Sequence, residues 1–90
     1  MKHATYAALC SLSDLLDRIR ARDGIKEKKF GIFYRKSKSF LHFHEDAAGM
    51  FADLSVGADF DRYPVNTVEE QTALLTAIDR VLSGGNASRS

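Results

Sequence analysis

The spacing of apolar residues changes twice along this 90-residue chain, and this limits the possible folds more than any other feature. Up to about residue 24 and again after Thr67, apolar residues recur every three or four positions, as in amphipathic helices. Between Phe30 and Val56 the period is two, which is typical of strands, and turn clusters at 36–39 and 46–49 interrupt it. The sequence therefore predicts an antiparallel meander between two helices.

Both predicted helices have recognisable ends, although the start of the first is ambiguous. Thr5 could cap a long first helix, whereas Ser11 or Ser13 could cap a shorter one, and Gly24 favours an end there. Thr67 followed by Glu70 is a capping box, the strongest local signal in the chain, and it predicts the start of the last helix.

These elements predict a single α+β domain over residues 1–83, with a disordered tail over 84–90. The sheet is expected to have three strands, or four if residues 60–63 form a short strand before Pro64. Because both helices are amphipathic, we expect both on one sheet face, with the other face left open.

The strand pattern suggests which side chains lie on that open face. The apolar face that begins at Met50 is expected to meet the helices, and the opposite face is expected to carry an aromatic patch. This predicted interaction surface consists of Phe33, Leu41, Phe43 and Phe51. An apolar patch on so small a protein favours burial against a partner. The first functional interpretation is therefore a non-enzymatic interaction module that forms a homodimer through the sheet.

A second interpretation arises from a basic hairpin over residues 26–38, in which cations alternate with aromatic residues. Its predicted nucleic-acid contacts are Lys28, Lys29, Arg35, Lys36 and Lys38. Cations can hold phosphates while rings stack on bases, so this pattern is compatible with nucleic-acid binding.

A third, minor interpretation is a metal site. His42 and His44 are two residues apart on a predicted strand, so they project from the same side, and Asp46 at the following turn could add an oxygen. Two ligands are fewer than a metal site needs, so no metal ligand is assigned. No nucleophile motif or glycine-rich phosphate loop is present, so no catalytic residue, cofactor or enzymatic activity is predicted.

Composition sets the remaining limits. The net charge of +1 does not demand a nucleic-acid or membrane partner, and the single cysteine, Cys10, excludes an internal disulfide. No apolar run approaches the ~18 residues that a membrane span requires. A cytoplasmic location without a membrane partner is the expectation.

Part of the chain resembles a family of short uncharacterised bacterial proteins. The resemblance is carried by the segments FLHFHED at 40–46, GMFADL at 49–54 and RYPV at 62–65, about half of the chain. The layout is also distantly similar to the MmcQ/YjbR-like α+β proteins, although the longer C-terminal part of that group is lacking. These resemblances imply an α+β fold and assign no activity or functional residue.

Overall fold

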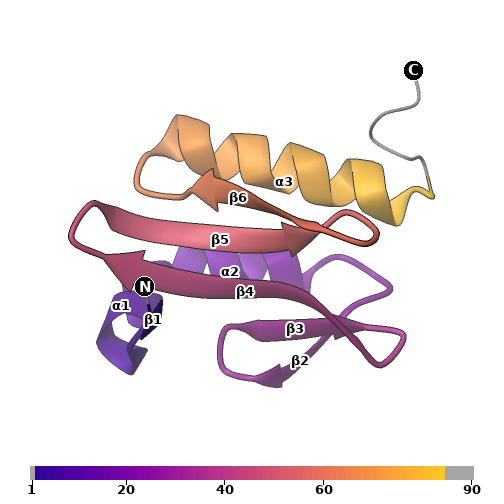
Figure 1. Ribbon diagram of the computed structural model, residues 1–90, viewed down its shortest axis with the longest axis horizontal. Coiled ribbons are helices and arrows are strands. Elements are labelled where there is room, and N and C mark those ends of the chain that lie inside the picture. The colour runs from indigo at the N-terminus through magenta and orange to yellow at the C-terminus, as the bar shows by residue number, and fades with distance from the viewer. Residues whose placement is uncertain (1, 85–90) are drawn as a thin grey trace.

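The computed structural model describes residues 2–84, and side chains from Ala4 onward. Figure 1 shows an α+β fold in which helices flank an antiparallel sheet, which confirms the predicted class. In chain order the elements are β1 (Lys2–His3), α1 (Tyr6–Cys10), α2 (Ser13–Arg20), β2 (Lys26–Lys29), β3 (Ile32–Arg35), β4 (Lys38–Asp46), β5 (Gly49–Ser55), β6 (Phe60–Pro64) and α3 (Val68–Leu82).

The sheet has more strands than the sequence predicts. Its order is β2-β3-β4-β5-β6, and β1 pairs with the C-terminal end of β4. The optional fourth strand is present as β6, whereas β2 was missed because Lys-Glu-Lys-Lys resembles a polar connector. The charges of β2 fit an edge strand, where lysines discourage pairing with other chains.

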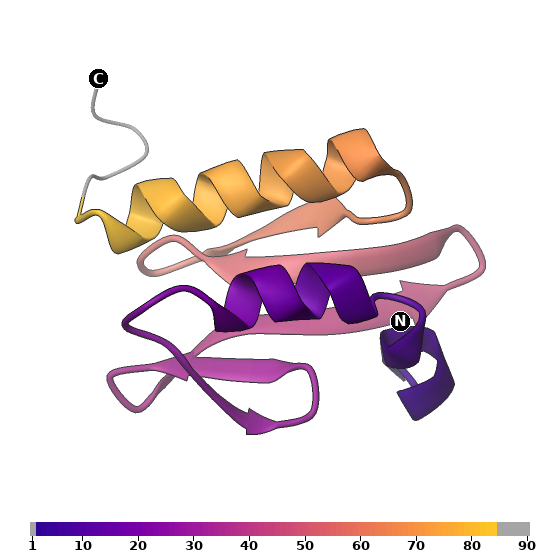
Figure 2. The same ribbon diagram turned by 180° about the vertical axis from the view of Figure 1, so that it is seen from behind.

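The helices α2 and α3 lie together on one face of the sheet, as the view from behind shows (Figure 2). Between them and the sheet lies the core, whose largest fully buried side chains are Phe33, Leu15, Leu16, Ile19, Leu41, Leu54, Leu74, Ile78 and Val65. Apolar burial of this kind is the main stabilising contribution for a domain of this size.

The predicted cap at Thr5 is present, whereas Ser13 is the first residue of α2 and not its cap, since Leu12 occupies the N-cap position without a side-chain hydrogen bond. Thr5 caps α1, its Oγ1 accepting a hydrogen bond from Ala8 N at 3.2 Å, and the chain then turns at Ser11 before α2 begins at Ser13. The capping box of α3 is present as predicted: Thr67 Oγ1 accepts from Glu70 N at 3.1 Å, and Glu70 Oε1 accepts from Thr67 N at 3.2 Å.

The predicted aromatic surface is wrong, because three of its four residues lie in the core. Phe33 is 1% exposed, Leu41 is 0% exposed and Phe43 is 2% exposed, all on the covered face. The two-residue loop after Asp46 pairs that residue with Gly49, which places Phe43 beside Ala52 and His44 beside Phe51. Paired residues share a face, so Phe51 lies on the opposite side from the other three.

Two further findings concern membrane-spanning helices and the predicted C-terminal tail. Among residues 2–84, no helix is long and apolar enough to cross a membrane. The predicted tail lies outside the described residues, apart from Gly84.

Candidate functional site

The turn between β3 and β4 is the first feature of a candidate site. Lys36 has φ 54° and Ser37 has φ 69°, so two consecutive residues with side chains adopt the left-handed conformation. Such two-residue hairpin turns favour Asn-Gly, because this conformation costs most other residues about 1–2 kcal/mol. A lysine therefore occupies the tip of the hairpin at a conformational cost.

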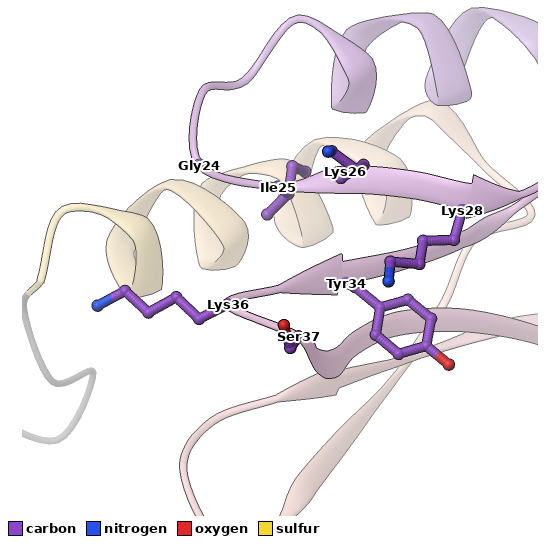
Figure 3. A pocket seen from close by; sticks show the side chains of 7 residues that line it. All are labelled: Gly24, Ile25, Lys26, Lys28, Tyr34, Lys36 and Ser37. Carbon is purple, nitrogen blue, oxygen red and sulfur yellow. The ribbon is translucent and has the colours of Figure 1, made fainter.

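Cationic side chains surround this turn on both sides. One hollow of about 420 Å³, shown in Figure 3, is lined by Gly24, Ile25, Lys26, Lys28, Tyr34, Lys36 and Ser37. A second hollow, of about 360 Å³, is lined by Arg35, Lys36, Lys38, Ser39, Phe40, Ser55, Gly57 and Val81. Neither lining contains a carboxylate. Lys36 belongs to both linings, so the two hollows lie on either side of the turn that carries this lysine.

Among residues 4–84, the cations near this turn have no carboxylate partner, and neither do Arg18 and Arg80 on the helices. Arg20, Arg22 and Arg62 each form ion pairs with carboxylates. Within residues 4–84, no carboxylate oxygen lies within 4.0 Å of the predicted nucleic-acid contacts Lys28, Lys29, Arg35, Lys36 and Lys38. Arg35 Nη1 instead donates to the carbonyl of Val81 at 3.5 Å.

The aromatic residues that alternate with these cations in the sequence lie in different parts of the structure. Phe33 lies in the core, and Phe30 contacts Tyr6 of α1 with tilted rings whose centroids are 5.1 Å apart. Tyr34 is half-buried, with Lys28 Nζ 5.2 Å from its ring centroid, and Figure 3 shows the two side chains alongside each other. Tyr34 is therefore the ring that accompanies the basic tip.

Glu27 links the β2–β3 hairpin to helix α2 through hydrogen bonds. Its carboxylate accepts from Arg20 Nη2 at 3.0 Å and from the backbone N of Gly31 at 2.8 Å. The Arg20 hydrogen bond, with help from Gly31, lowers the pKa of Glu27 below its ordinary value of 4.5, although burial opposes this shift. The folded state thus favours the ionised carboxylate.

Replacing Glu27 with glutamine is expected to lower the free energy of unfolding at pH 7 by about 1–2 kcal/mol, since a charge-assisted bond is lost. Because folding lowers the pKa of Glu27, its ionic stabilisation is present above pH 4.5 and lost as pH falls through the folded pKa. Urea unfolding at pH 7 and at pH 3 measures both effects. The difference between wild type and variant should shrink at pH 3, and an equal difference at both values would contradict this assignment.

A second cluster lies on the sheet face away from the helices. His42 and Asp53 are paired across β4 and β5, and His44 lies two residues further along the same strand. His44 Nε2 is 2.9 Å from Asp53 Oδ2, and the rings of His42 and His44 meet edge to face with centroids 4.8 Å apart. The predicted oxygen from Asp46 is directed elsewhere, since Asp46 Oδ1 accepts from Ala48 N.

Arg62 of β6 completes this cluster. Its Nε donates to Asp53 Oδ1 at 2.9 Å and its Nη2 donates to Asp53 Oδ2 at 3.1 Å. This hydrogen bonding lowers the pKa of Asp53, although burial acts in the opposite direction. Asp53 is 8% exposed, and sequence reasoning missed it because its cross-strand partner depends on the β4–β5 register.

The fold and these clusters define a small α+β protein with one sheet face covered by helices. Comparisons of the chain with models of protein families, with curated proteins and with solved structures find no match.

Proposed function

We propose that this protein binds single-stranded nucleic acid through the basic tip, which we define as Lys28, Tyr34, Arg35, Lys36 and Lys38. The observation that carries the proposal is the gathering of cations without carboxylate partners on both sides of one turn. Unpaired cations are available to hold phosphates and to release counterions when they do so.

The tip also offers a surface for bases. A half-buried tyrosine presents a ring while the buried part fixes its position, and base stacking on such a ring contributes about 1–3 kcal/mol. Stacking tolerates any base, so this arrangement supports binding with little sequence preference. A flexible single strand can follow the hollows on either side of this turn more easily than a stiff duplex can.

The interpretation as a self-associating module now has weaker support. Phe33, Leu41 and Phe43 are buried against the helices, which leaves Phe51 as the one member of the predicted interaction surface on the opposite face. Homodimerisation through that face stays a prediction. The basic tip therefore carries the proposed function.

Changing Lys36 and Lys38 together to glutamate is expected to weaken binding of a fluorescent 20-nucleotide single strand by at least about tenfold. Two phosphate contacts become repulsive, and fluorescence anisotropy measures the loss. If all four cations of the tip hold phosphates, the wild-type affinity should fall roughly 50-fold between 50 and 200 mM salt, from a slope of about −0.7 for each contact.

A matched control carries the same change in net charge on the helices, where Arg18 and Arg80 are exposed. The double change of these arginines to glutamate should leave the affinity within about twofold. Tyr34→Leu should weaken the binding of nucleic acid by about tenfold and leave the binding of polyglutamate unchanged, because only nucleic acid has bases that stack on the ring. Equal losses in both charge variants, or equal binding of the two polyanions, would contradict the proposal.

A further inference from the structure

Three potential metal ligands converge on the sheet face away from the helices. They are His42 and His44 of β4 and Asp53 of β5, and one donor atom from each lies within 4.8 Å of the others. The strand register produces this arrangement, because His42 is paired with Asp53 and His44 follows on the same face. The cluster is thus built into the sheet.

Burial distinguishes the cluster from a chance gathering of surface residues. Among residues 4–84, Asp53 is the one charged residue that is buried, and both histidines are half-buried. Their donor atoms therefore project from strands whose backbones are held on both sides by neighbouring strands. A site on such strands needs little ordering when it binds a ligand.

The distances are close to those of a bound ion. Zinc bonds of about 2.0–2.1 Å place tetrahedral ligand atoms roughly 3.3 Å apart. His44 Nε2 and Asp53 Oδ2 already lie 2.9 Å apart, and the widest separation in the cluster exceeds the ideal by about 1.5 Å, so binding requires a histidine side chain to rotate. Two imidazoles and a carboxylate form a ligand set that suits zinc and related divalent metals.

We propose that His42, His44 and Asp53 bind one divalent transition-metal ion, zinc being the reference case. Arg62 positions the carboxylate through two hydrogen bonds, from Nε to Asp53 Oδ1 and from Nη2 to Oδ2, and Oδ2 also lies 2.9 Å from His44 Nε2. Outer partners of this kind orient metal ligands. The site is separate from the basic tip and does not depend on nucleic-acid binding.

Calorimetric titration of the full chain with zinc chloride tests the site. Wild type is expected to bind one zinc ion per chain, and His42→Gln and His44→Gln are each expected to weaken binding at least tenfold. Zinc should raise the thermal unfolding midpoint of wild type more than that of either variant. Unchanged affinity in both variants would overturn the proposal.

Controls address the other ligands in the chain. Cys10 is exposed and could bind zinc by itself, so Cys10→Ser should leave the affinity unchanged, as should His3→Gln. A measurement on wild type avoids variants altogether: zinc should shift the NMR signals of the His42 and His44 rings and leave those of His3 in place. Shifts confined to His3, or loss of binding in Cys10→Ser, would overturn the assignment.

Discussion

Phe33→Ala is expected to lower the free energy of unfolding by about 3–5 kcal/mol, the largest effect of any single change considered for this protein. Phe33 is 1% exposed and is paired with Leu41 under the helices, so truncation leaves a cavity in the core. A domain of this size has a total stability of roughly 5–10 kcal/mol, so the variant should approach the limit of folding. Urea unfolding followed by circular dichroism measures the loss.

Phe51→Ala is the matched control, since it removes the same atoms from the opposite sheet face. Phe51 is half-buried, and we expect a loss of roughly 1 kcal/mol. The alternating pattern had placed Phe33 and Phe51 on the same face, so the two variants test the observed register directly. Similar losses in both would contradict the assignment of Phe33 to the core and of Phe51 to the other face.

Gly31→Ala is expected to cost about 2–4 kcal/mol, the second largest effect. Gly31 has φ +78°, a conformation that is strained for alanine, and an added Cβ would lie 2.8 Å from Leu9 Cδ2 and 2.9 Å from Leu9 Cδ1. Leu9 is 6% exposed, so its methyl groups cannot move without disturbing the packing of α1. Thermal unfolding should show a lower midpoint.

Gly57→Ala separates backbone strain from packing. Gly57 also has a positive φ, +114°, but an added Cβ would meet nothing within 4 Å. We expect a loss of about 1–2 kcal/mol, from strain alone. If Gly31→Ala costs no more than Gly57→Ala, the contact between Leu9 and the β2–β3 turn is not close-packed as described.

The helical parts of the fold were predictable because their signals are local. The capping box at Thr67 and Glu70 acts over three residues, and its two hydrogen bonds are present. The break between α1 and α2 was not predicted, because Thr5 and Ser13 were treated as alternatives. In the structure Thr5 caps α1, and a second helix begins at Ser13 after a turn, with Leu12 at its N-cap position.

Strand positions were predicted better than strand partners. The alternation in β5 correctly placed Ala52 and Leu54 against the helices. It could not place β4 relative to β5, because a shift of one residue exchanges the two faces. The same uncertainty concealed the histidine cluster: His42 and His44 stood out in the sequence, whereas Asp53 joins them only through the register.

The sequence by itself determined that helices flank a sheet, since periodicity and capping are properties of neighbouring residues. It also determined where the cations gather, because Lys28 and Lys36 lie close together in the sequence. Only the tertiary structure decided which face of each strand is buried and which distant side chains meet. The physical reason is that pairing between strands depends on hydrogen bonds and packing across the whole sheet, which no short stretch of chain specifies.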